Sequence, residues 1–224
     1  MKVTLLYKTA KIETNHLNLE KIEIPKVAED EVLIRIKACG VCKSNLNMIE
    51  GDWEDLGVPS KFPIFPGHEI VGIVEKVGKN VSWINEGERV GVQSLYKTCG
   101  KFEYRLSRRE NLCLEAEITG ATVDSGYAEY MKANTYHVYK VPDNLKDEEV
   151  APLFCPGVTA YRAVKLAEVS FGKKVAIFGI GGVAHLAFNI KDFKFSNEQI
   201  IKGSVIGIRI DMKKVLEIAS KGLN

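Results

Sequence analysis

Two cysteines and one histidine are the residues of this sequence best suited to hold a reactive metal ion. Cys42 lies in the string CGVCKSN, His68 in FPGHEI and Cys155 in LFCPGVTAYRA. Two thiolates and an imidazole suit Zn²⁺, and three protein ligands leave one tetrahedral position open, as in catalytic zinc sites. The three residues are far apart in the sequence, so only a fold could bring them together. A single buried Cys or His is more often a packing residue.

The first two-thirds of the chain predicts short strands that could position these ligands. Residues 31–37 alternate apolar and polar side chains, as a half-buried strand does. Prolines and glycines separate the apolar runs. The pattern predicts an antiparallel, partly barrel-like domain, followed by a helical stretch from residue 142 through 151 towards 166. The other expected strands lie at 69–77, 89–92, 127–131 and 137–141.

Beyond residue 173 the pattern changes to a strand, a glycine turn and a helix. Residues 174–178 are an apolar run, and Gly179, Gly181 and Gly182 lead into a helix-like segment. Such glycines let the backbone approach a pyrophosphate at a helix N-terminus, as in dinucleotide-binding folds. The glycine pattern alone is a weak signal. Directly behind a segment with a zinc-ligand pattern, it favours NAD or NADP binding.

Composition excludes several kinds of partner. The chain has 224 residues and a formal net charge of +2, so neither nucleic acid nor an anionic membrane surface is indicated. No apolar run is long enough to span a bilayer, and the N-terminus lacks a signal-peptide pattern. The five cysteines suit metal ligation more than a disulfide framework. We therefore expect a cytoplasmic protein without membrane partners.

Seven strings of the sequence match one known family in order and at close to its spacing. The chain resembles the zinc-dependent alcohol dehydrogenases of the medium-chain dehydrogenase/reductase family from about residue 1 to about residue 188. The resemblance implies an α/β fold, with a GroES-like zinc-binding catalytic domain over 1–153 and a truncated Rossmann NAD(P)-binding domain over 154–224. The strings are CGVC at 39–42, GDW at 51–53, GHE at 67–69, EGERVGV at 86–92, SGYAEY, APLFCPGVTAYRAV and VAIFGIGGVAHLAF.

The same resemblance implies a role for each candidate site residue. It makes Cys42, His68 and Cys155 the ligands of one catalytic zinc, with Glu69 beside the metal and Ser44 passing on the alcohol's proton. Open alternatives are a solvated surface position for Lys43, a turn position for Ser44 and a core position for Trp53. The remaining implied roles are Lys43 at the cofactor phosphates, Thr159 at the nicotinamide, Gly179, Gly181 and Gly182 at the pyrophosphate, and Trp53 in the alcohol pocket.

Some positions depart from the family pattern. Asn45 stands where the family usually has an aspartate that orients the ligating histidine, and we expect its amide oxygen to accept the same N–H without carrying a charge. Asn47 replaces a histidine that ends the proton relay, so protons would have to leave through water. The C-x-x-C of Cys39 and Cys42 could indicate redox chemistry, but the longer match favours a packed thiol at Cys39.

The family's four-cysteine structural zinc site is lost. Its positions correspond to Cys99, Phe102, Arg105 and Cys113, and neither Phe nor Arg can ligate zinc. Cys99 and Cys113 are then either free thiols or a weak pair. One catalytic zinc is the only metal that we expect.

The end of the chain is shorter than the resemblance requires. About a hundred residues of the cofactor domain and the closing segment are expected to be missing, with a junction near 189–195. An independent short variant with its own compact topology is the alternative. Glu198 has the spacing of a ribose-binding acid, but its surroundings match a later segment. Cofactor binding is therefore expected to be weakened or lost.

Two functions remain open from the sequence. The first is a zinc-dependent alcohol dehydrogenase that oxidises alcohols to aldehydes or ketones with hydride transfer to NAD(P). The second is an inactive zinc-binding relative or deletion product without cofactor binding. The expected partners are a small alcohol or aldehyde and, in a homo-oligomer, a second copy of the chain, because a shortened sheet leaves apolar edges.

Overall fold

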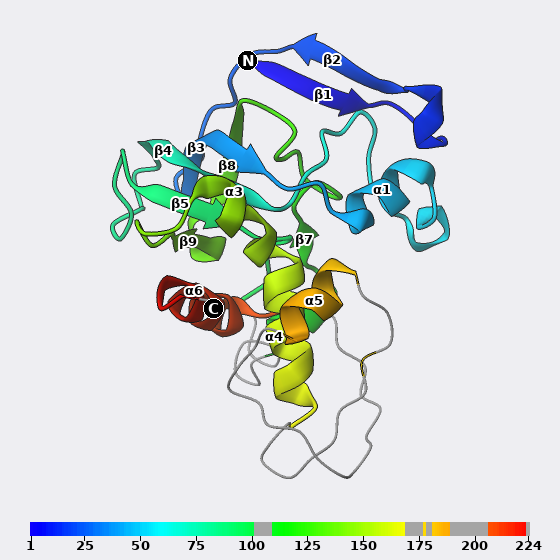
Figure 1. Cartoon of the computed structure of the whole chain (residues 1–224). Helices are drawn as coiled ribbons and strands as arrows, with labels where there is room; N and C mark the ends of the chain where they lie inside the picture. The colour runs from blue at the N-terminus through cyan, green and yellow to red at the C-terminus, as the bar shows by residue number, and fades with distance from the viewer. Residues whose placement is uncertain (101–108, 169–176, 178–180, 189–205, 223–224) are drawn as a thin grey trace.

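A five-stranded antiparallel sheet forms the centre of the protein (Figure 1). The computed structural model describes residues 1–100, 109–168, 177, 181–188 and 206–222. The strand order is β8-β3-β4-β5-β9, so β3, β4 and β5 have neighbours on both sides. The strands are β3 (Glu31–Cys39), β4 (Ile70–Val77), β5 (Arg89–Val92), β8 (Tyr130–Asn134) and β9 (Val138–Lys140).

Strand β3 shows how the sheet departs from a simple alternating pattern. Val32, Leu33 and Ile34 are consecutive and all buried. The pairing of β3 with β4 shifts between Leu33 and Ile34 and again between Ile36 and Ala38. Such irregularities bend a strand and re-aim its side chains, so the alternation expected for 31–37 holds only in part.

Two smaller sheets and several short helices flank the central sheet. The pair β1-β2 is antiparallel, as is the pair β6-β7. These elements are β1 (Lys2–Leu6), β2 (Leu17–Lys21), β6 (Leu95–Lys97), β7 (Glu117–Ile118), α1 (Lys43–Glu50), and the 3-10 helices η1 (Ile12–Thr14), η2 (Glu54–Leu56), η3 (Glu110–Leu112) and η4 (Thr135–His137).

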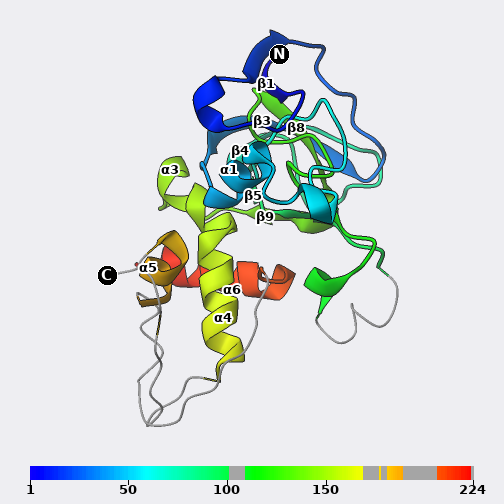
Figure 2. The ribbon, with the colours of Figure 1, turned by 90° about the vertical axis from the view of Figure 1, so that its right-hand side faces the viewer.

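The last three described helices, α4, α5 and α6, lie together below the sheet in both ribbon views (Figures 1 and 2). The helical stretch expected from 142 to 166 is divided into α3 (Asp147–Val150), η5 (Ala151–Phe154) and α4 (Pro156–Leu166). Cys155 interrupts it with φ −131° and ψ −76°. Proline disfavours the helical conformation for the residue before it, so Pro156 explains the break. Two more helices follow, α5 (Gly182–Phe188) and α6 (Arg209–Ser220).

One hydrophobic cluster joins the sheet to these helices. Val71 of β4 and Tyr139 of β9 share it with Phe154 of η5 and Val158 of α4. Met212, Val215, Leu216 and Ala219 of α6 are buried in the same cluster. Helix α6 therefore docks on the β-rich part of the chain, across the boundary expected at 153/154. The division into two domains stays a prediction.

The mixed α/β class and the strands near 31–37, 69–77, 89–92 and 137–141 are confirmed. The strand expected at 127–131 begins later, at Tyr130. The strand expected at 174–178 lies outside the described residues apart from Ile177. In the described parts of the chain, no helix has the length and apolarity needed to cross a membrane.

Candidate metal centre

Cys42 stands where strand β3 gives way to helix α1. It is the N-cap of α1, with extended backbone angles of φ −79° and ψ 145°. Its carbonyl oxygen accepts hydrogen bonds from the backbone N–H groups of Asn45 and Leu46. The first turn of the helix thus holds Cys42 at a defined position beside the end of the sheet.

Cys155 reaches the same place from the helical side of the molecule. It precedes Pro156 at the start of α4, and its carbonyl accepts the backbone N–H of Thr159 at 3.0 Å. Phe154, which is fully buried, packs its ring directly over Gly91 of β5. The packing of Phe154 on the sheet therefore places the cysteine that follows it.

His68 and Glu69 immediately precede strand β4 and are both buried. The backbone N–H of Gly40 donates to the carbonyl of Glu69 at 2.9 Å. A Cβ atom at Gly40 would overlap the Glu69 carboxylate, so a larger residue at this position would displace the Glu69 side chain. Gly67 has φ +98°, a conformation that favours glycine, and it turns the chain just before His68.

The four side chains form one compact cluster. One ligand atom from each of Cys42, His68, Glu69 and Cys155 lies within 4.8 Å of all the others. The Cys42 and Cys155 Sγ atoms are 3.5 Å apart. Among the described residues, this is the only group of three or more Cys, His, Asp or Glu side chains with such spacing. The structure therefore brings together the three ligands and the glutamate suggested by the sequence.

The pKa values of the cluster residues are shifted because two thiols and a carboxyl group, each negative when ionised, lie close together. The pKa of Cys42 is lowered to about 3, chiefly by the hydrogen bond from the Cys155 thiol. The same hydrogen bond, together with burial, raises the pKa of Cys155. Burial and the adjacent Cys42 raise the pKa of Glu69 to about 8. Each additional negative charge is thus disfavoured, and a divalent cation would relieve that cost.

Two buried polar atoms near the cluster have no protein partner. The Nε2 atom of His68 makes no hydrogen bond, although the side chain is only 6% exposed. The Oδ1 atom of Asn45 is likewise buried without a partner, so the hydrogen bond expected from His68 to this amide oxygen is not made. Buried polar atoms are nearly always paired, so an unpaired imidazole nitrogen in a cysteine cluster fits a metal ligand.

The remaining candidates on the N-terminal side surround Cys42. Lys43 is exposed and Ser44 is partly buried, both in the first turn of α1. Trp53 is partly buried and packs against a hydrophobic cluster that contains Leu6 and Met48. This contact fits the alternative in which Trp53 is a core residue. The role of Trp53 in an alcohol pocket stays a prediction.

The described residues expected at the nicotinamide and the pyrophosphate lie on helix α4 and at the start of helix α5. Thr159 is partly buried in the first turn of α4. Gly181 and Gly182 are exposed at the start of α5, and a Cβ on Gly182 would lie 3.8 Å from that of Pro156. The glycine turn therefore adjoins the segment that carries Cys155. Gly179 lies outside the described residues, as does Glu198.

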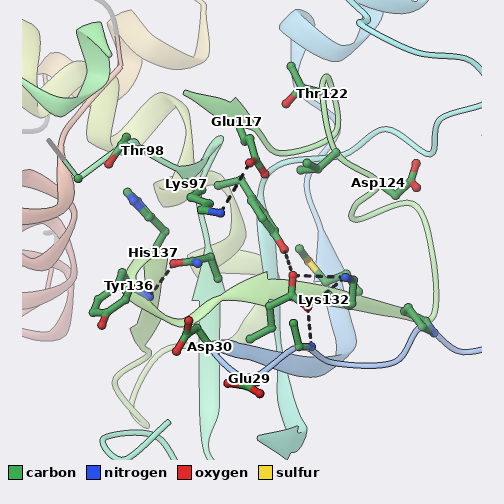
Figure 3. Close-up of a pocket in the computed structure, with 18 of the residues that line it drawn as sticks. Glu29, Asp30, Lys97, Thr98, Glu117, Thr122, Asp124, Lys132, Tyr136 and His137 are labelled. Carbon is green, nitrogen blue, oxygen red and sulfur yellow. Dashed lines mark hydrogen bonds and ion pairs between the residues drawn. The ribbon is translucent and has the colours of Figure 1, made fainter. Parts of the chain in front are cut away.

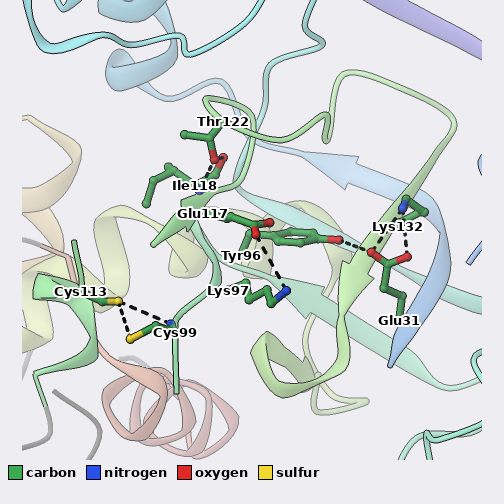
Figure 4. A network of polar contacts seen from close by, with 9 residues as sticks. All are labelled: Glu31, Tyr96, Lys97, Cys99, Cys113, Glu117, Ile118, Thr122 and Lys132. Atoms are coloured by element: carbon green, nitrogen blue, oxygen red, sulfur yellow. Dashed lines mark hydrogen bonds and ion pairs between the residues drawn. The ribbon is translucent and has the colours of Figure 1, made fainter. Parts of the chain in front are cut away.

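The positions of the lost second zinc site are partly described. The Cys99 and Cys113 Sγ atoms are 3.2 Å apart (Figure 4). Phe102 and Arg105 lie outside the described residues. Cys39, the last residue of β3, is a partly buried thiol packed against the hydrophobic cluster of the central sheet, and burial raises its pKa to about 12.

A separate cavity of about 820 Å³ lies away from the metal cluster (Figure 3). Lys132 and Tyr96 line it, and both side chains donate hydrogen bonds to the Glu31 carboxylate. His137 also lines it, buried, with its Nδ1 atom unpaired. Sequence reasoning missed His137, because no motif contains it.

Comparisons with known proteins identify the family of this chain. The family model for the Alcohol dehydrogenase GroES-like domain matches residues 28–143. An alcohol dehydrogenase of Geobacillus stearothermophilus is 48% identical over 171 residues, which are 76% of this chain and 50% of that protein.

Two solved structures show the same similarity in three dimensions. A candidate zinc-binding dehydrogenase from Sinorhizobium meliloti 1021, bound to NADP, is 26% identical with a TM-score of 0.74, and the match covers 84% of this chain and 52% of that one. A cobalt- and zinc-bound alcohol dehydrogenase from Pyrobaculum aerophilum, at 21% identity and a TM-score of 0.85, is similar in fold over 100% of this chain and 89% of that one.

The chain belongs to the zinc-type alcohol dehydrogenases of the medium-chain dehydrogenase/reductase family, through their GroES-like domain. The resemblance found in the sequence is thereby confirmed. The chain spans about half the length of the curated relatives it matches.

Proposed function

We propose that this chain is a zinc-dependent alcohol dehydrogenase that oxidises small alcohols to aldehydes or ketones with NAD or NADP. The convergence of Cys42, His68 and Cys155 carries this proposal. Three separate segments deliver a ligand set with two sulfurs and one nitrogen, and the unpaired Nε2 of His68 is available to a metal.

Cys42, His68 and Cys155 would hold the zinc, with the Glu69 carboxylate beside it. When bound, zinc acts as a Lewis acid that favours ionisation of an alcohol near neutral pH. Burial of His68 and Glu69 limits water at the site, which strengthens charge interactions there.

The chain's own side chains would move the proton. The Ser44 hydroxyl lies two residues from Cys42 in the first turn of α1 and is partly buried. It would accept the alcohol's proton at Oγ while its own proton passes to water. Asn47 cannot titrate, so water is the next acceptor along this helix.

Residues of α1, α4 and the start of α5 would hold the cofactor. NAD or NADP supplies the acceptor for hydride when bound. Lys43 would contact its phosphates, Thr159 would line the nicotinamide side, and the glycine turn at 181–182 would approach the pyrophosphate. The NADP in the Sinorhizobium meliloti relative supports a nicotinamide cofactor for this chain.

Zinc content and cofactor binding, measured on the same preparation, test this function. We expect one zinc per chain and NAD or NADP binding detectable by calorimetry, with alcohol oxidation followed by cofactor absorbance. Zinc without cofactor binding would favour the alternative, an inactive zinc-binding relative. Absence of tightly held zinc would overturn both.

Cellular location and assembly are further parts of the proposal. The odd number of cysteines and their spacing, which suits metal ligation more than a disulfide framework, favour a reducing compartment such as the cytoplasm. A homo-oligomer would cover exposed apolar side chains such as Leu19 and Leu114. Sedimentation analysis measures the assembly state directly.

A further inference from the structure

Cys99 and Cys113 form a thiol pair away from the metal centre. Cys99 follows strand β6 and is partly buried, whereas Cys113 follows η3 and is buried. Their Sγ atoms are 3.2 Å apart, and the backbone N–H of Cys99 donates to Cys113 Sγ at 3.5 Å (Figure 4). A disulfide needs an S–S distance of about 2.0 Å, so a small side-chain adjustment would close it.

The pair lacks the partners that a metal site requires. The sequence from 100 to 112 contains no further cysteine or histidine. Within the described residues, no third Cys, His, Asp or Glu joins this pair in a metal-binding group. Two thiolates alone leave a tetrahedral zinc site half filled.

We propose that Cys99 and Cys113 form a reversible intramolecular disulfide when the protein meets a low-molecular-weight disulfide such as glutathione disulfide. This modification site is independent of the proposed dehydrogenase activity, because it shares no residue with the metal centre.

The two cysteines have different parts in the exchange. The Cys99 thiolate, on the more exposed residue, attacks one sulfur of glutathione disulfide, and the first glutathione leaves as a thiolate that takes up a proton. The Cys113 thiolate then attacks Cys99 Sγ and releases the second glutathione, which is also protonated. Two protein thiols are oxidised and one glutathione disulfide is reduced to two glutathione molecules.

The hydrogen bonds around Cys113 favour its thiolate form, which the second step of the exchange requires. Burial opposes ionisation, but hydrogen bonds with the Cys99 backbone and thiol, and one from the backbone of Glu115, outweigh it and lower the pKa of Cys113. The thiolate, not the thiol, is the attacking species.

The disulfide would tie η3 to strand β6. Glu110 of η3 accepts hydrogen bonds from the Arg209 side chain and from its backbone N–H at the start of α6. A disulfide between residues 99 and 113 lowers the conformational entropy of the unfolded chain. The oxidised protein should therefore be more resistant to unfolding than the reduced one.

Peptide mapping of the full-length, zinc-loaded protein tests the proposal. After incubation with glutathione disulfide, alkylation and trypsin, we expect peptide 98–101 linked to peptide 110–132, with the loss of two hydrogens. Reduction should separate them. Recovery of the two peptides unlinked, each alkylated or each carrying glutathione, would overturn the proposal.

A matched variant checks the order of attack. In Cys113→Ser, Cys99 should accumulate as a mixed disulfide with glutathione, because no second thiol resolves it. The melting temperature should rise on oxidation in the parent protein and not in Cys113→Ser. An equal rise in both, or an unmodified Cys99 in the variant, would contradict this mechanism.

Discussion

His68 illustrates how single residues of the proposed metal centre depend on distant neighbours. Its buried Nε2 atom has no protein partner, and neither does Oδ1 of the nearby Asn45. Leaving such a group unpaired costs about 1–3 kcal/mol. A bound zinc would remove that cost at His68, so metal binding and stability should be linked.

Replacing Cys155 by serine tests the ligand set. A hydroxyl is a much poorer zinc ligand than a thiolate, so Cys155→Ser should lower the zinc content well below one per chain. Cys113→Ser is the control and should leave zinc content unchanged, since Cys113 lies in the other thiol pair. Metal analysis of both variants gives the answer. Two tightly held zincs per chain in the parent protein would contradict a single site.

His137 should make stability depend on pH. Burial, and then the charge of Arg209, lower its pKa from 6.5 to about 4, against an opposing effect of Glu110. Between these values the unfolded state binds more protons than the folded state, so stability falls as pH falls through this window. His137→Gln should flatten the dependence by at most about 1.4 kcal/mol per pH unit. Urea unfolding across the window measures it, and parallel curves for the two proteins would refute it.

Helix α6 is held to the rest of the protein by buried charge as well as by apolar contact. The Asp211 carboxylate is fully buried and accepts hydrogen bonds from Arg162 and Lys165 of α4, at 2.9 Å and 2.6 Å. It also caps its own helix by accepting the backbone N–H of Ile208. One side chain thus serves both the start of α6 and its docking on α4.

Asp211→Asn should be strongly destabilising. It leaves the buried Arg162 without its counter-charge, which typically costs about 3–5 kcal/mol. Glu217→Gln on the same helix is the control. Its pairs with Lys214 and Lys221 are exposed, so a change of about 0.5 kcal/mol or less is expected. Chemical denaturation of both variants compares them, and equal losses would show that the buried pair has no special role.

The packing of η5 on the central sheet should determine how well Cys155 is placed to bind zinc. A Cβ on Gly91 would overlap the Phe154 ring, so Gly91→Ala should destabilise by about 1–3 kcal/mol and reduce zinc retention. The double variant with Phe154→Leu should recover part of the loss, because a smaller side chain relieves the overlap. A strictly additive double-mutant cycle would argue against this contact.

At the scale of the whole molecule, one core connects the described parts of the chain. Helix α6 buries four side chains against residues of β4, β9, η5 and α4. The described C-terminal helix is therefore packed on the β-rich part of the chain.

The main prediction for the whole molecule is a weakened affinity for the cofactor. Glu198 has the spacing of a ribose-binding acid, but the sequence around it is unlike that of a cofactor-binding strand. Loss of a charge-assisted ribose contact costs about 1.5–3 kcal/mol, or about one to two decades in affinity. We expect NAD to bind correspondingly more weakly than to a full-length family member such as the Geobacillus stearothermophilus enzyme. Calorimetry on both proteins measures it, and equal dissociation constants would show the expectation to be wrong.

The sequence alone determined the family, the fold class and most local structure. The strand at 89–92 was predicted with its observed bounds, because its apolar side chains and flanking turn residues are local signals. The strings around Cys42, His68 and Cys155 identified the candidate ligands. The break of the helical stretch at Cys155 was missed, although Pro156 signals it.

Only the tertiary structure decided which distant side chains meet. The approach of Cys42 to Cys155, the burial of Asp211 between Arg162 and Lys165, and the pairing of Cys99 with Cys113 join segments separated in sequence. No local pattern encodes such contacts, because each depends on how separate segments of the chain pack against one another. Local propensity sets the backbone of each segment, whereas burial and charge pairing between segments set the site.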